Sequence, residues 1–134
     1  MVTVSKKREE KLAKLVREFF AVHPEVKLVA ITGSAGKASA KIAIGTVLAQ
    51  QFDIQLRNEE PKTKADVFLQ MMGVKMPEKG LFKWWKVMRA VKKRIKAEKP
   101  EVQVIVQEFN PKELGYNDWF KAYVVPDITV VTSV

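Results

Sequence analysis

The sequence predicts an α/β fold with three layers, in which a mostly parallel sheet of about four strands is flanked by helices. Two observations lead to this prediction. Short apolar runs, typical of strands buried on both faces, alternate along the chain with longer segments of helical periodicity. Such alternation favours crossover connections between parallel strands, which place helices on the faces of the sheet. A length of 134 residues fits one domain, residues 1–134.

The chain begins with an amphipathic segment within residues 1–24. Apolar residues at helical spacing predict a helix over Lys6–Val22. Ser5 suits the cap of its first turn. The pair His23-Pro24 ends the helix, because a residue before proline avoids helical backbone angles.

Four apolar or alternating runs predict the strands, and the segments between them predict the remaining helices. The strands are expected at Val26–Thr32, Phe52–Arg57, Val102–Gln107 and Asp127–Val134. The helices are expected at Lys37–Gln51, Ala65–Met72, Leu81–Glu98 and Tyr116–Val124. For the helix that starts at Lys37, the expected apolar side consists of Ile42, Ile44, Val47 and Leu48. For the helix that starts at Leu81, it consists of Trp84, Met88, Val91 and Ile95.

The composition restricts the function classes. No cysteine is present, which excludes disulfides and thiolate metal sites, and the single histidine, His23, leaves little room for a zinc site. The net charge of +9 attracts anions such as nucleotides, nucleic acid or acidic lipids, although the same charge also serves solubility alone. No signal peptide is evident, and no apolar run approaches the ~20 residues of a membrane span. We therefore expect a cytoplasmic protein without a membrane span.

A glycine loop after the first predicted strand is the main candidate site. Gly33 and Gly36 permit backbone angles at which successive amides point at one anion, and Lys37 adds a full positive charge. The helix that follows contributes its positive N-terminal end. This arrangement is typical of a P-loop-type domain, although a glycine turn without a ligand has the same composition. The residues expected to bind a nucleotide are Thr32, Gly33, Ser34, Ala35, Gly36, Lys37, Ala38 and Ser39.

The spacing within the loop narrows the prediction. A general P-loop, G-x-x-x-x-G-K-[ST], would need glycine at position 31, where the chain has Ile31. The same mismatch argues against an ordinary small-molecule kinase. A shorter form is T-G-[ST]-x-G-K-[ST]. Thr32–Lys37 match its first six positions, and only the last position, where the chain has Ala38, differs. With the later runs VIVQEF, which contains Glu108, and PDITVVTSV, the chain resembles the central ATP-binding domain of the Mur ligases.

The resemblance implies an ATP-dependent amide ligase with ATP and Mg²⁺ as cofactors. In that chemistry a substrate carboxylate attacks the γ-phosphate to give an acyl phosphate, and an amine then displaces phosphate. Lys37 and the loop amides would hold the phosphates, and Glu108 would ligate the metal, so these two side chains are the expected catalytic residues. A UDP-sugar-peptide substrate would be bound through other domains, which 134 residues do not accommodate.

The chain departs from the family pattern at position 38, where Ala38 replaces a metal-ligating hydroxyl. Ser39 does not take over this role, because one residue along a helix turns about 100°. An additional water on Mg²⁺ would fill the gap. We therefore expect weakened nucleotide binding, a larger loss of turnover, and no complete ligase activity from this chain alone.

An interaction module is the alternative interpretation. In it the nucleotide site is vestigial, and the basic helix Lys83–Lys96 contacts nucleic acid, anionic lipid or a protein, with nucleic acid the less expected partner. Trp84, Trp85 and Met88 on this helix fit a membrane interface, but core packing on one side with a solvated lysine face on the other is the favoured interpretation.

Overall fold

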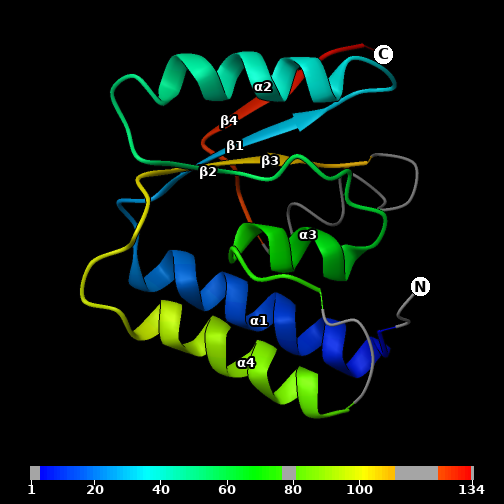
Figure 1. Ribbon diagram of the computed structural model, residues 1–134, viewed down its shortest axis with the longest axis vertical. Helices are drawn as coiled ribbons and strands as arrows, with labels where there is room; N and C mark the ends of the chain where they lie inside the picture. Colours follow the sequence, from blue (N-terminus) through cyan, green and yellow to red (C-terminus); the bar gives the residue numbers. More distant parts are fainter. Residues whose placement is uncertain (1–3, 77–80, 111–123, 134) are drawn as a thin grey trace.

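The computed structural model describes residues 4–76, 81–110 and 124–133, and it has the predicted α/β architecture. Its four strands form one parallel sheet in the order β2-β3-β1-β4 (Figure 1). The strands are β1 Lys27–Thr32, β2 Ile54–Leu56, β3 Val104–Glu108 and β4 Ile128–Val131. Three of them lie within the runs that predict them, and β3 extends one residue past its predicted end at Gln107, to Glu108.

The register brings the ends of three strands to one edge of the sheet. Ile31 of β1 is paired with Glu108 at the end of β3, and Thr32 is paired with Val131 at the end of β4. The pairing continues past the strand, since the amide of Phe109 donates to the carbonyl of Ile31 at 2.8 Å. The glycine loop after β1 therefore starts beside Glu108 on one side and the end of β4 on the other.

The helices form a layer on each face of the sheet (Figure 1). The upper face in the figure carries α2 (Lys37–Leu48), which packs on a small core that includes Val29 and Ile31. The lower face carries α1 (Lys6–Val22), α3 (Lys64–Met71) and α4 (Leu81–Lys96), which enclose the larger core. The three-layer prediction is confirmed.

Local signals explain where the first helix begins and ends. The Ser5 hydroxyl accepts from the amide of Arg8 at 3.3 Å, and the amide of His23 donates to the carbonyl of Phe19 at 2.9 Å. The His23 ring does more than its predicted role at the helix end. Its Nε2 lies 2.9 Å from the carbonyl oxygen of Ile95, so the buried imidazole also joins α1 to the end of α4.

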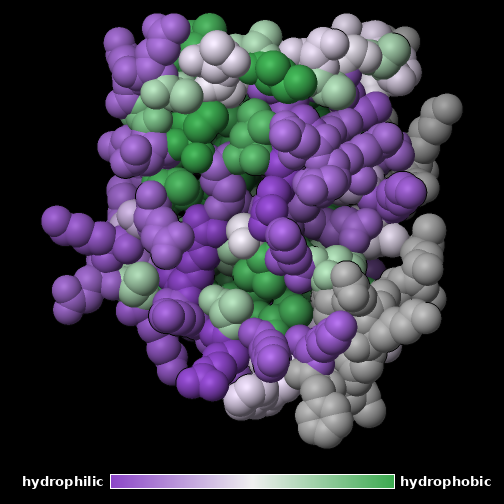
Figure 2. Space-filling view, in the orientation of Figure 1, coloured by the Kyte–Doolittle hydropathy of each residue, from purple (hydrophilic) through white to green (hydrophobic). Residues whose placement is uncertain are grey.

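The predicted apolar side of α2 is wrong at two positions. Ile42 and Val47 are exposed by 55% and 67%, although Ile44 and Leu48 pack against the sheet as expected. The helix instead turns its smallest residue inward. A Cβ atom on Gly45 would lie 2.5 Å from Leu56 Cδ1, so α2 approaches β2 closely along the Gly45 side. This orientation carries positions 42 and 47 to the outer surface. Hydrophobic side chains show at the surface in the upper part of Figure 2, where α2 lies.

The two adjacent tryptophans of α4 have different environments. Trp84 is buried, as are Val91 and Ile95, whereas Trp85 is 63% exposed and Met88 is half-buried. The helix predicted over Tyr116–Val124 lies almost entirely outside the described residues. Among the residues that the structure describes, no helix has the length and apolar character needed to cross a bilayer.

Candidate phosphate-binding site

The loop between β1 and α2 depends on two glycines with positive φ. Gly33 has φ +136° and Gly36 has φ +82°, and both values favour glycine. The requirement is greater at Gly33, because a Cβ atom there would lie 2.2 Å from the Thr132 hydroxyl oxygen and 2.9 Å from the Ser133 amide nitrogen. The chain leaving β4 therefore closes directly over the start of the loop.

The helix after the loop begins without a side-chain cap. Gly36 occupies the N-cap position, so no N-cap side chain accepts a hydrogen bond from the first turn. The first amides of a helix, here those of Lys37, Ala38 and Ser39, have no partner within the helix. Together with the helix dipole they form a place for an anion at the carboxyl edge of the sheet, where ligands of such folds bind.

Lys37 lies folded back across the loop. Its Nζ donates to the carbonyl of Gly33 at 2.8 Å, and the side chain is half-buried. The ammonium group therefore lies over the loop itself. If a phosphate oxygen replaced the Gly33 carbonyl as its acceptor, the ammonium group would bind the ligand. The charged phosphate oxygen accepts the stronger hydrogen bond.

Two hydroxyl groups after β4 occupy the inside of the loop. Ser133 Oγ accepts from the amides of Ser34 at 3.2 Å and Ala35 at 2.9 Å, and it lies 2.8 Å from Ser34 Oγ. The Thr132 hydroxyl lies within hydrogen-bond distance of the carbonyls of Thr32 and Ala35, so its one proton is shared between them. The Ser133 oxygen thus takes the place of an anionic oxygen at two loop amides.

Thr32 contributes a buried hydroxyl at the start of the site. The residue is 4% exposed, and its Oγ1 makes no hydrogen bond within the described part of the chain. A buried polar atom without a partner is rare in proteins and requires an explanation. With the glycine loop and the uncapped helix, this hydroxyl fits a ligand with several oxygens, such as a phosphate chain.

Glu108 has a different environment from the one expected of a metal ligand. Its Oε2 lies 2.8 Å from Nζ of Lys41, and the two residues are 4% and 1% exposed. Lys41 Nζ also donates to the carbonyl of Asn58 at 3.3 Å. A buried ion pair therefore joins α2 to the end of β3 and to the segment after β2.

The predicted residues thus fall into three groups. Thr32, Gly33, Ser34, Ala35, Gly36 and Lys37 surround the loop, as expected. Ala38 and Ser39 are exposed on the first turn of α2 and offer their amides. Glu108 lies next to the loop strand but is paired with Lys41.

The site residues fit a phosphate group better than a magnesium ion. Position 38 has no hydroxyl, and the Glu108 carboxylate is already bound to an ammonium group. Among the described residues, no group of three or more histidine, cysteine, aspartate or glutamate side chains is arranged to hold a metal. Mg²⁺ at a nucleotide keeps several waters and takes one or two protein carboxylates, so at Glu108 it would have to compete with the Lys41 ammonium group.

Two residues that contact this site, Lys41 and Ser133, were not predicted from the sequence as site residues. Helical spacing does carry a signal for Lys41, since positions 41, 44 and 48 fall on one face and Ile44 and Leu48 were expected to be buried. Ser133 gives no such signal. Its position follows from β4 pairing next to β1, which the sequence alone does not determine.

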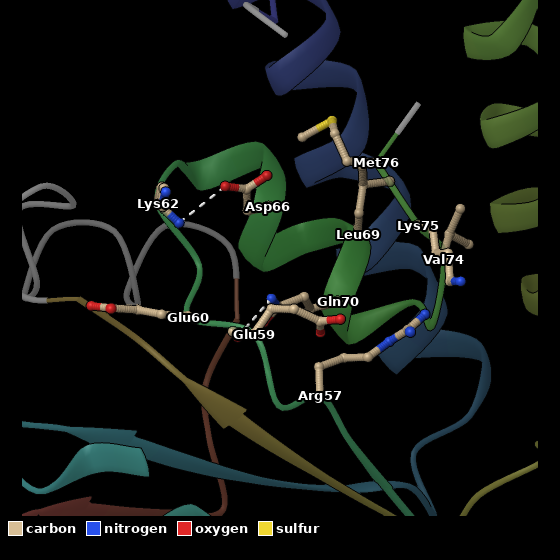
Figure 3. A pocket seen from close by; sticks show the side chains of 10 residues that line it. All are labelled: Arg57, Glu59, Glu60, Lys62, Asp66, Leu69, Gln70, Val74, Lys75 and Met76. Carbon is tan, nitrogen blue, oxygen red and sulfur yellow. Dashed lines mark hydrogen bonds between the residues drawn. The ribbon is translucent and has the colours of Figure 1, made fainter. Parts of the chain in front are cut away.

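A cavity of about 360 Å³ lies at the same edge of the sheet, after β2 (Figure 3). It has the size of a small-molecule site and is lined by side chains of both charges. Several polar groups there are already engaged: Asp66 accepts from the Lys62 amide at 3.0 Å, and Gln70 donates to the Glu59 carbonyl at 3.1 Å. Asn58, whose carbonyl is bound by Lys41, connects this cavity to the loop region.

The fold and the loop together define a three-layer α/β domain with a candidate phosphate-binding site at the carboxyl edge of its sheet. Comparisons with protein-family models, with curated proteins and with solved structures found no match for this chain.

Proposed function

We propose that this chain is an ATP-binding domain whose loop Gly33–Lys37 holds the phosphates. The observation that carries the proposal is the glycine loop between a central parallel strand and a helix that starts without a side-chain cap. Backbone amides, the helix dipole and the Lys37 ammonium all favour negative charge at this place. The Thr32 hydroxyl, which has no hydrogen-bond partner among the described residues, lies at the same place and supports the proposal.

The short loop form and the two later strands favour a Mur-type amide ligase of peptidoglycan precursor synthesis. The pattern is nearest to the member that joins D-alanyl-D-alanine to UDP-N-acetylmuramoyl-tripeptide. Within such a ligase, which acts in the cytoplasm, this domain would hold ATP while its UDP-sugar-peptide substrate is bound elsewhere. We propose nucleotide binding for the chain alone and not complete ligation, because Ala38 offers no hydroxyl to a metal.

Titration with a fluorescent ATP analogue tests the proposal. We expect saturable binding by the wild type and a loss of at least about tenfold in affinity in Lys37→Ala, since a charged hydrogen bond to phosphate contributes roughly 1.5–3 kcal/mol. Lys14→Ala is the matched control, because Lys14 is an exposed lysine on α1. Absence of binding, or equal affinity in Lys37→Ala, would contradict the proposal.

A second candidate function uses the outward face of α4. The helix contains seven lysine and arginine residues and no acidic residue. Arg89 lies over the exposed Trp85 ring at 5.3 Å, and Lys92 and Lys96 continue the same side of the helix. Hydrophilic side chains dominate the layer below the sheet in Figure 2. This face suits an anionic partner.

The burial of the opposite face of α4 decides which partner fits best. A helix that inserts into a membrane interface needs a free apolar face, but Trp84, Val91 and Ile95 are buried in the core. The outward face offers an aromatic ring and a row of cations. These groups match the stacking surfaces and phosphates of single-stranded nucleic acid.

Anisotropy of a labelled single-stranded oligonucleotide at several salt concentrations tests this second candidate. We expect Lys92→Gln to reduce the salt slope by about 0.7 for each lost phosphate contact. Trp85→Ala should weaken binding without changing that slope. No binding at low salt would reject the candidate, and binding to anionic vesicles in place of the oligonucleotide would assign the face to lipid.

A further inference from the structure

The buried ion pair between Lys41 and Glu108 changes what the site requires from a ligand. Lys41 is the only other charged residue of α2 besides Lys37, and both lie toward the sheet edge, one helical turn apart. Lys41 is 1% exposed, with its Nζ 2.8 Å from Glu108 Oε2. A lysine is almost never this buried unless it is paired, so the pair is a built part of the site.

The carboxylate that would attract a divalent ion is thus already neutralised by the protein. A magnesium ion at Glu108 would have to displace the Lys41 ammonium and leave it buried without a counter-ion, which is costly. The ammonium is also held by the Asn58 carbonyl at 3.3 Å, which further opposes displacement. Ala38 provides no oxygen to compensate for that loss.

We propose that the loop binds the phosphates of a nucleotide without a divalent cation, with Lys41 as the internal cation that satisfies Glu108. This inference rests on the proposed function and specifies its ligand as the free nucleotide anion. Since Lys41 cancels Glu108, the loop faces the ligand with the uncancelled charge of Lys37 and the positive end of α2. Such a site attracts free ATP at least as strongly as the magnesium complex, whose net negative charge is smaller.

Lys41 is a positioning residue in this account, because it acts on Glu108 and on the Asn58 carbonyl and does not reach into the loop. It keeps the end of β3 and the segment after β2 against α2. Its removal would release the Glu108 carboxylate, which would then be available to a metal ion.

The test is a titration of the wild-type protein with a fluorescent ATP analogue, once in excess EDTA and once in excess Mg²⁺. We expect the affinity in EDTA to equal or exceed that in Mg²⁺, with any advantage of Mg²⁺ below about threefold. Binding that requires Mg²⁺, or that Mg²⁺ strengthens by about tenfold or more, would overturn the inference while leaving ATP binding intact. Absence of binding in both conditions would instead reject the proposed function, and the inference with it.

Two variants make the role of Lys41 testable. Lys41→Met should acquire Mg²⁺-dependent binding, because Glu108 is then unpaired, whereas the exposed control Lys14→Met should behave like the wild type. The double variant Lys41→Met/Glu108→Leu removes both charges and should keep binding that is independent of Mg²⁺, so it provides a folded comparison if the single variant unfolds. Loss of metal-free binding in a folded double variant would contradict the inference.

Discussion

The hydroxyl oxygen of Ser133 lies 2.9 Å from the amide nitrogen of Ala35, inside the loop that is proposed to receive phosphate. The same oxygen accepts from the Ser34 amide at 3.2 Å. A bound phosphate oxygen would compete with this hydroxyl for the two amides, and as a charged acceptor it would form the stronger bonds.

Ser133→Ala should therefore tighten nucleotide binding, by about threefold, because the hydroxyl no longer competes for the loop amides. The measurement is the dissociation constant of a fluorescent ATP analogue. Thr46→Ala is the control, since it removes a hydroxyl from the exposed side of α2. A loss of affinity in Ser133→Ala would mean that the hydroxyl shapes the loop for its ligand and does not compete with it.

The Lys41–Glu108 pair should also control stability. Lys41→Met leaves a buried carboxylate without its partner, which we expect to cost about 3–5 kcal/mol in the free energy of unfolding. The double variant Lys41→Met/Glu108→Leu should recover most of this loss, because a buried ion pair and apolar residues of similar size are often equally stable. Urea denaturation followed by circular dichroism gives both values. A single variant as stable as the wild type would show that the pair is accessible to water.

The two glycines of the loop should differ in their tolerance of alanine. Gly33→Ala places a Cβ atom against Thr132 and Ser133 at φ +136°, so we expect a loss of more than about 3 kcal/mol. Gly36→Ala meets only Thr132 Cβ at 3.8 Å and should cost about 1–2 kcal/mol for its left-handed backbone. Thermal unfolding of the two variants compares them directly. Equal losses would place the chain after β4 farther from the loop than described.

The adjacent tryptophans Trp84 and Trp85 of α4 allow the loss of a buried ring to be compared with the loss of an exposed one. Trp84→Ala removes a buried ring and should cost about 3–5 kcal/mol, whereas Trp85→Ala removes a ring that is 63% exposed and should change stability by less than about 0.5 kcal/mol. Denaturant unfolding monitored by the remaining tryptophan fluorescence measures both. Similar losses would indicate that the outward face of α4 is covered.

The strands and helices were predictable because their signals are local. Apolar runs mark the four strands, and Ser5 and His23 mark the ends of α1 where the structure has them. The apolar face of α2 was not fully predictable. Periodicity alone does not reveal that Gly45 permits a close approach to Leu56, and this approach turns Ile42 and Val47 outward.

The candidate site was predictable only in its contiguous part. The loop Gly33–Lys37 is a single stretch of sequence, and its φ values agree with the need for glycine. The contacts of Ser133 with the loop and of Lys41 with Glu108 join residues that are far apart in the chain. They depend on the strand order, with β1 between β3 and β4, which no local pattern encodes.

Backbone amide NMR shifts during a titration with ATP show which residues meet the phosphates. If the loop amides and Lys37 bind them, the largest shifts occur at Gly33–Ser39, and Lys37→Ala greatly reduces these shifts. Shifts confined to α4, or none at the loop at saturating ATP, would contradict phosphate binding by the loop.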